Sequence, residues 1–163
     1  MNGKNLILGV AAAIVVVAAI IVAQTMVSEN AGSPATVIES ALLPVAMVQA
    51  GPVLLTAEVA STPEDRAKGL GGRSGLATGE GMLLDFDKPD LYGIWMKNMQ
   101  FPLDIIWLDT NLMVVHIESS VSPTTYPAVF KPSSPAKYVL EAPVGFVAES
   151  GLTVGATVGI SGI

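Results

Sequence analysis

The hydrophobic pattern divides the chain into one long apolar run and a series of short alternating segments. Residues Leu6 to Ala23 carry no charge, and these 18 positions would span about 27 Å as a helix, close to the thickness of a bilayer core. Lys4 precedes the run and Glu29 is the first charge after it, so the positive-inside bias places the N-terminus in the cytoplasm. The pattern predicts an uncleaved single-pass anchor, with the remaining residues periplasmic or extracellular.

A cleaved signal peptide is the alternative interpretation of this N-terminal run. Its Ala, Val and Ile residues would suit the apolar part of a signal peptide. However, the run exceeds the usual length of about 7 to 15 residues, and no clear small-x-small cleavage site follows Ala23. The anchor therefore remains the first expectation.

The next periodic segments predict a strand followed by a short helix. Apolar and polar residues alternate from Val53 to Ala60, as in a half-buried strand. Thr62 is a suitable N-cap and Pro63 suits the first helical position. The glycines that begin at Gly69 should end the helix.

Further alternating segments predict a mainly β domain. The expected strands are Met82 to Phe86, Tyr92 to Asn98, Leu103 to Leu108, Leu112 to Glu118, Lys137 to Glu141 and Thr157 to Ile160. The turn at Asp109 to Asn111 should join two of them as a hairpin, and the few residues from Met99 to Pro102 should join Tyr92 to Asn98 with Leu103 to Leu108 as another. Four prolines predict an irregular loop from Ser119 to Pro135, and Val144 to Ser150 should form a short helix ended by Gly151.

These elements predict a small β-barrel or β-sandwich with two short helices, preceded by one N-terminal transmembrane helix. The expected organisation is an anchor or signal peptide at residues 1–27, a tether at 28–51 and a β domain at 52–163. The tether carries glycines and prolines, with one short strand expected at Val45 to Val48.

Composition restricts the chemistry that this domain can perform. Residues 24–163 keep seven Lys and Arg but all 14 Asp and Glu, a formal charge of −7, so a nucleic-acid-binding surface is not expected. The chain has no cysteine and therefore no disulfide framework, thiolate metal site or Cys nucleophile. His116 is the single histidine, which excludes a histidine-rich metal site. We expect no metal and no cofactor.

An ordered series of motifs resembles a known family. The run IWMKNMQFPLDIIWLD covers Ile94 to Asp109; RAKGL, GGRSGL and GML lie before it, and PAKYVLEAPVG at Pro135 to Gly145 lies after it. Over roughly residues 53–160 the chain resembles the uncharacterised family known as DUF192 or UPF0127. The resemblance implies a fold but no established reaction. Gly155-Ala156 stands where relatives commonly show Gly-Asp, which removes a carboxylate and argues against a site at that corner. Gly71 stands where a larger apolar residue is common, which puts the packing of the loop after Gly69 in doubt, but not its fold.

The family signature contains three polar residues among apolar ones. Lys97, Asn98 and Asp104 should lie together at one end of the hairpin, where a ligand pocket could open beside Trp95. The structural alternative is a partly buried ion pair between Lys97 and Asp104, with Asn98 bonding the turn.

Three other polar residues have both a functional and a structural interpretation. Arg73 and the neighbouring glycines could cradle an anion, or Arg73 could pair with an acidic residue beside a tight turn. Glu141 lies in the apolar strand segment YVLEAP and should receive a cation or backbone amides. His116, two positions from Glu118, should be structural, with a role as a base as the alternative.

Three functions are compatible with these residues. The first is an envelope module that binds a small ligand, a glycan or a partner protein, with Arg73, Trp95, Lys97, Asn98, Asp104 and Glu141 as candidate binding residues. The second is a hydrolase that uses Asp104 with Lys97 or His116 as acid and base. The third is a scaffold in which the signature residues only stabilise the fold.

Overall fold

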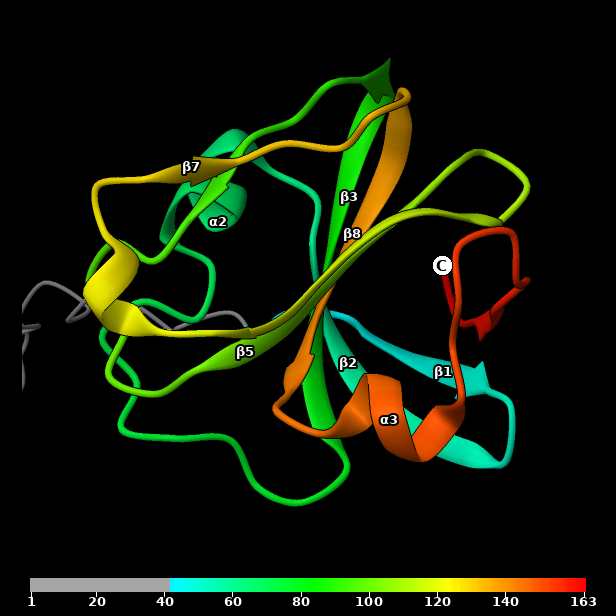
Figure 1. The fold of residues 1–163 in the computed structure, drawn as a ribbon, viewed down its shortest axis with the longest axis horizontal. Helices are drawn as coiled ribbons and strands as arrows, with labels where there is room; N and C mark the ends of the chain where they lie inside the picture. The colour runs from blue at the N-terminus through cyan, green and yellow to red at the C-terminus, as the bar shows by residue number, and fades with distance from the viewer. Residues whose placement is uncertain (1–41) are drawn as a thin grey trace, which may run out of the picture. The chain divides into compact units, whose positions relative to one another are not determined.

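The computed structural model describes residues 42–163, and a seven-stranded sheet forms the core of this part of the chain (Figure 1). Seven strands follow one another in the order β6-β5-β8-β3-β2-β1-β9. Their bounds are β1 Val45–Ala50, β2 Val53–Ala60, β3 Glu80–Asp90, β5 Leu103–Leu108, β6 Val114–Val121, β8 Ala136–Pro143 and β9 Gly159–Ser161. A separate two-stranded ribbon consists of β4 (Ile94–Trp95) and β7 (Val129–Phe130). Two short helices, α2 (Pro63–Lys68) and α3 (Phe146–Ser150), and the 3-10 turn η1 (Pro123–Thr125) complete the described chain. The prediction of a mainly β domain with two short helices is confirmed.

Helix α2 forms the crossover between β2 and β3, which pair in parallel. The Thr62 side chain accepts a hydrogen bond from the Asp65 amide at 3.1 Å, and Pro63 begins the helix. Gly69 ends it with a φ of 51°, a left-handed value that glycine adopts at little cost. The capping signals in the sequence therefore located this helix correctly.

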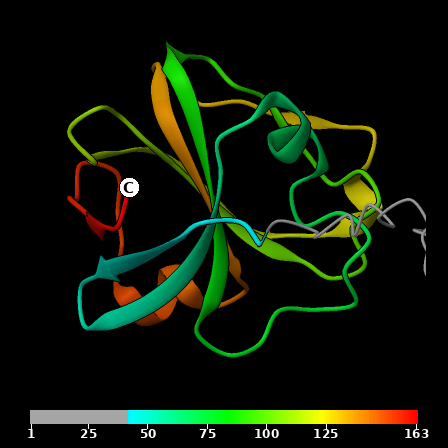
Figure 2. The ribbon, with the colours of Figure 1, turned by 180° about the vertical axis from the view of Figure 1, so that it is seen from behind.

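Both faces of the sheet are covered (Figures 1 and 2). One apolar cluster contains residues of β1, β2, β3, β5 and β8 together with Phe146 of α3. The other contains Trp107 of β5 and Leu84 of β3, with Leu70 after α2 and Ile94 of β4 packed over them. Side chains alternate between the two clusters along each central strand, as the period of two requires. The segment from α2 to β4 therefore covers one face and α3 the other.

The expected barrel is not formed, because the sheet does not close. Strands β6 and β9 are its two edges. The segments next to them meet at an isolated bridge between Met113 and Thr157, supported by a hydrogen bond of 2.8 Å from the Val114 amide to the Ala156 carbonyl. A single bridge does not pair β6 with β9 along their length, so the sheet remains open.

The hairpin predicted from Tyr92 to Leu108 is also wrong. Only Ile94–Trp95 of its first strand is extended and paired, and its partner is β7 from the proline-containing loop. β5 instead lies between β6 and β8. The second predicted hairpin is confirmed, since β5 and β6 pair in antiparallel fashion around Asp109, whose Oδ1 accepts the amides of Asn111 at 2.8 Å and Met113 at 2.9 Å.

Two predictions concern the N-terminal part of the chain. The anchor at Leu6 to Ala23 lies outside the described residues 42–163. Among the helices of that described range, none has the length and hydrophobicity needed to cross a bilayer. Within the segment interpreted as a tether, Val45–Ala50 forms β1 and pairs with both β2 and β9, because alternate side chains from Ala46 to Ala50 are fully buried.

Candidate functional site

Asp104 is a structural residue at the centre of the fold. Its side chain is buried, and Oδ1 accepts the Ser120 amide at 2.8 Å. Oδ2 accepts the amides of Gly145 at 3.1 Å and Val147 at 3.0 Å, at the start of α3. The predicted ion pair with Lys97 is wrong, because neither Lys97 nor Asp104 takes part in an ion pair within the described residues. Three backbone amides occupy this carboxylate instead.

The sheet separates Asp104 from its predicted catalytic partners. Asp104 lies opposite Ala142 in the β5–β8 ladder, whereas Glu141 lies opposite Ile105 and so points to the other face. His116 is paired with Trp107 on β5, with the two rings 5.3 Å apart, and its Nε2 lies 3.0 Å from Glu118. The structure thus does not bring Asp104 together with Lys97, His116 or Glu141.

A cleft of about 550 Å³ opens between α2, β3 and the segment around β4. This volume lies within the range of about 300 to 1,000 Å³ that is usual for small-ligand sites. Its walls carry the apolar side chains of Leu84, Ile94 and Met99 and three aromatic rings. Those rings belong to Phe86, Tyr92 and Trp95. The described chain has seven cationic side chains, and four of them line this cleft: Arg66, Lys68, Lys88 and Lys97.

Glu141 also lines the cleft and is the most unusual group in it. The residue is 6% exposed, and its Oε2 atom is buried with no hydrogen-bond partner in the described structure. Burial raises the pKa of this carboxyl to about 7, while a hydrogen bond from the Leu70 backbone and the positive charge of Arg73 lower it in part. Burial opposes ionisation because charge is poorly solvated in the interior. Glu141 is therefore poised to change its charge near neutral pH.

Gly69 brings the backbone close to this carboxylate. A Cβ atom at Gly69 would lie 3.4 Å from Oε2 of Glu141, so any side chain there would crowd the acid. Gly71 lies against Lys68 and Lys97, whose carbonyl oxygens would be 2.9 and 3.3 Å from an added Cβ. Glycine fits at position 71 because it has no side chain, which lets the end of α2 at Lys68 and the loop at Lys97 come close to the backbone there. The packing that the sequence left in doubt is therefore explained.

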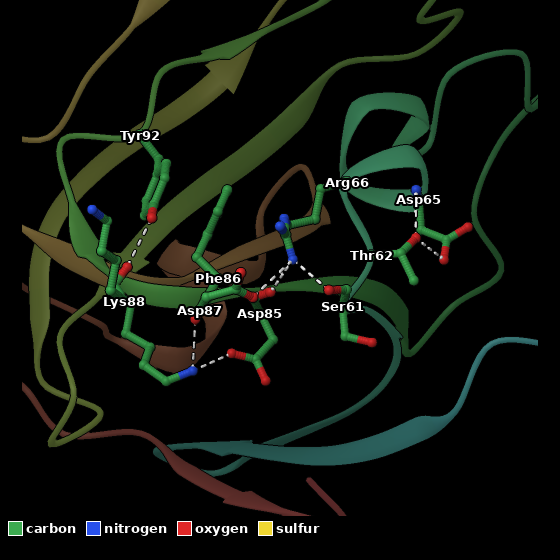
Figure 3. A network of polar contacts seen from close by, with 10 residues as sticks. Ser61, Thr62, Asp65, Arg66, Asp85, Phe86, Asp87, Lys88 and Tyr92 are labelled. Atoms are coloured by element: carbon green, nitrogen blue, oxygen red, sulfur yellow. Dashed lines mark hydrogen bonds and ion pairs between the residues drawn. The ribbon is translucent and has the colours of Figure 1, made fainter.

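Arg66 fixes one wall of the cleft (Figure 3). Its Nη1 donates to the backbone carbonyls of Ser61 and of Asp85, the latter at 2.8 Å, and its guanidinium lies 5.0 Å from the centre of the Phe86 ring. Figure 3 shows Phe86 between Arg66 and Tyr92, and the two rings stack with centres 3.6 Å apart. A hydrogen bond of 2.8 Å from the Tyr92 hydroxyl to the Lys88 carbonyl completes this wall.

The rim of the cleft is basic and partly exposed. Lys97 lies 5.2 Å from the centre of the Trp95 ring, which is 45% exposed. Lys68, Lys88 and Lys97 are exposed, and none of them forms an ion pair with a described residue. Three ammonium groups are therefore available to an anionic ligand.

A smaller hollow of about 250 Å³ adjoins the cleft and shares Lys68 and Lys97 with it. Asn98 lines this hollow, with a left-handed φ of 60°. The amide of Gly72 donates to the Asn98 carbonyl at 2.9 Å, which ties the glycine turn after α2 to the loop after β4. Lys68 and Lys97 therefore lie at the boundary between the cleft and the smaller hollow.

Arg73 does not line the cleft. Its Nη1 and Nη2 atoms donate to the two carboxylate oxygens of Glu58 at 2.7 and 2.8 Å. This hydrogen-bonded partner holds the pKa of Glu58 below its usual range. The interpretation of Arg73 as the partner of an acidic residue is confirmed, and its influence on Glu141 is electrostatic.

The structure places three of the candidate residues, Trp95, Lys97 and Glu141, in the cleft and Asn98 in the adjoining hollow. Sequence reasoning missed Lys68 and Lys88 as site residues. The sequence did carry a signal for Lys68, because this residue lies in the last turn of the predicted helix, directly before the glycines that end it. Within residues 42–163, His, Asp and Glu side chains do not cluster in threes as a metal site would require.

Residues 46–160 match the model of the family DUF192, described as an uncharacterized ACR. No curated protein matches the chain.

Two solved bacterial structures share the fold. A provisionally assigned transcription regulator from Sinorhizobium meliloti is 28% identical with a TM-score of 0.69, covering 75% of this chain and 97% of its own. A protein of unknown function from Novosphingobium aromaticivorans is 31% identical with a TM-score of 0.67, covering 79% of this chain and 94% of its own.

Proposed function

The chain belongs to the DUF192 family of uncharacterised proteins, and from that premise we propose that its β domain is a ligand-binding module with its site in the cleft between α2 and β4. The observation that carries this proposal is the buried Oε2 atom of Glu141, which lines the cleft without a hydrogen-bond partner. A buried acceptor without a partner costs about 1 to 3 kcal/mol. A ligand with a suitable donor would remove that cost, which gives the cleft an intrinsic affinity for such molecules.

The surrounding groups support binding more directly than catalysis. The cleft combines an apolar wall with a few polar groups, which is usual for small-ligand sites. Asp104, the carboxylate on which the hydrolase hypothesis depended, is occupied by three backbone amides. As part of the same proposal, the apolar run at residues 6–23 anchors the domain outside the cytoplasm, where a small ligand, a glycan or an envelope protein is its partner.

A thermal-shift screen of the full chain in mild detergent tests the proposal. A library of small polar and anionic compounds should contain molecules that raise the melting temperature, because a ligand that binds only the folded state stabilises it. Glu141→Gln should abolish or reduce these shifts, whereas Glu149→Gln, which neutralises an exposed carboxylate outside the cleft, should leave them unchanged. Shifts that are identical in both variants would contradict the assignment of the cleft.

A second candidate function is an enzyme in which Glu141 acts as a general acid or base. It is favoured by the pKa of about 7 that burial produces, because an acid or base works best when its pKa is close to the working pH. Incubation of the ligands found in the screen with the wild-type chain would reveal this activity as product formation that Glu141→Gln removes. Recovery of every ligand intact would contradict it.

A further inference from the structure

We propose that the cleft and the adjoining hollow form one two-part site for an acidic sugar, with the ring against Trp95 and Glu141 and the acid group between Lys68 and Lys97. This inference rests on the proposed binding function and specifies the chemistry of its ligand. Three independent features of the site carry it: an acceptor, a set of cations and an exposed aromatic surface.

The acceptor is the carboxylate of Glu141. Oε2 has no partner and the residue is 6% exposed, so the site lacks a hydrogen-bond donor at this point. In its ionised form, which predominates above about pH 7, this carboxylate only accepts hydrogen bonds. The ligand must therefore supply a hydroxyl or amine group at the end that reaches Glu141.

The cations lie where the two hollows meet. Lys68 and Lys97 line both the cleft and the hollow, and neither is paired with a carboxylate of the described chain. The described chain carries 12 acidic and seven basic residues, so this basic region stands out against an acidic surface. Opposite charge of this kind concentrates anionic ligands at one place. The ligand is therefore expected to carry a carboxylate or phosphate group.

The aromatic surface is the ring of Trp95, which is 45% exposed although it lines the cleft. The Phe86 ring is covered on both sides, because it lies between Tyr92, which stacks on it, and Arg66. The Trp95 ring also has a cation near it, Lys97 at 5.2 Å from its centre, but it keeps its exposed surface. A half-exposed aromatic ring offers a flat, electron-rich surface to the C–H groups of a ligand. A sugar ring with an acid group combines this surface with hydroxyl donors and a negative charge in one small molecule.

Binding of a matched set of probes to the full chain in mild detergent tests the inference. The probes are glucuronate, glucose and acetate. Their binding is measured by calorimetry and by tryptophan fluorescence, to which Trp95 and Trp107 both contribute. Glucuronate should bind at least about tenfold more tightly than glucose or acetate, because each part of the site contributes to one ligand. The double variant Lys68→Met/Lys97→Met should bind glucuronate no better than glucose, while Lys131→Met, which removes a lysine outside the cleft, should retain the preference.

Glu141→Gln separates the two halves of the site. It should weaken the binding of glucuronate and glucose alike and leave acetate binding unchanged, since acetate needs only the lysines. Equal affinity for glucose and glucuronate, equal affinity for acetate and glucuronate, or tighter binding of adenosine monophosphate than of glucuronate would each overturn the acidic-sugar inference.

Failure of acidic-sugar binding and failure of ligand binding altogether give different results. If glucuronate does not bind but another class of compound stabilises the chain in a Glu141-dependent manner, the acidic-sugar inference is wrong and the binding function stands. If no compound does so, both fall.

Discussion

Oδ2 of Asp104 accepts a hydrogen bond from the amide of Val147 at 3.0 Å, which connects the start of strand β5 to the first turn of α3. The N-cap residue of that helix is Gly145, which has no side chain to cap it. Asp104 supplies the missing acceptor from a distant part of the sequence. Its negative charge also lies at the positive end of the helix, which is the favourable position.

Replacement of Asp104 by Asn should destabilise the fold by about 1 to 3 kcal/mol. Asn offers one acceptor oxygen where three backbone amides now bind, and its amide group would face donors. Urea unfolding followed by the fluorescence of Trp95 and Trp107 measures the change. The binding of cleft ligands by the folded variant should be unaffected, because Asp104 lies on the other face of the sheet. A variant as stable as the wild type would show that these hydrogen bonds contribute nothing.

The stability of the fold should fall as the pH rises from about 4.5 to about 7. The pKa of Glu141 is raised in the folded state, from 4.5 to about 7, so the folded state holds a proton that the unfolded state releases in this range. Unfolding is then favoured by increasing pH, and the difference corresponds to roughly 3 kcal/mol above pH 7. Urea unfolding at pH 5 and pH 8 measures the loss.

Glu141→Gln serves as the comparison for this pH effect. The variant cannot ionise at position 141, so its stability advantage over the wild type should grow between pH 5 and pH 8. All other titratable groups are the same in both proteins, so their contributions cancel in the difference. A constant difference across this range would mean that Glu141 does not titrate as described.

Replacement of Arg73 by Lys should cost no more than about 1 kcal/mol, the usual limit for an exposed ion pair. The side chains of Arg73 and Glu58 are 33% and 36% exposed, and Lys cannot form the two parallel hydrogen bonds that Arg forms. Because the pair depresses the pKa of Glu58, its contribution should be present at neutral pH and disappear as the pH falls through the folded-state pKa. A loss above about 2 kcal/mol would imply that the pair is more buried than the structure shows.

Arg73→Met should raise the pKa of Glu141 above about 7, because the positive charge of Arg73 lowers that pKa. NMR titration of a selectively labelled Glu141 carboxyl carbon measures the shift. Lys131→Met removes a charge that does not act on Glu141 and provides the control. An unchanged titration would separate Arg73 from the electrostatics of the site.

Gly81→Ala should destabilise the fold by about 1 to 3 kcal/mol through overpacking. A Cβ atom there would lie 2.6 Å from Cδ2 of Leu55 and 2.8 Å from the carbonyl oxygen of Glu141. Gly75→Ala is the matched control, since an added Cβ meets no atom within 4 Å. Equal stability of the two variants would contradict this packing.

The resemblance to the family and the elements with strong local signals were predictable from the sequence. The motif series identified the family. Thr62, Pro63 and Gly69 located α2, and Asp109 located the β5–β6 turn, because caps and turns depend on residues within a few positions of one another. The mainly β class followed from the period of two, which each strand shows by itself.

Only the tertiary structure decided which strands and charges meet. Nothing local to Ile94–Trp95 specifies β7 as its partner, and the short link to Leu103 suggested a hairpin that does not form. Asp104 finds its partners on β6 and at α3, and Glu141 lies beneath the turn at Gly69. Which side chains are buried, and which partners they find, depends on the packing of segments that are distant in the chain. This packing gives Asp104 three backbone partners and places Glu141 in the wall of the cleft.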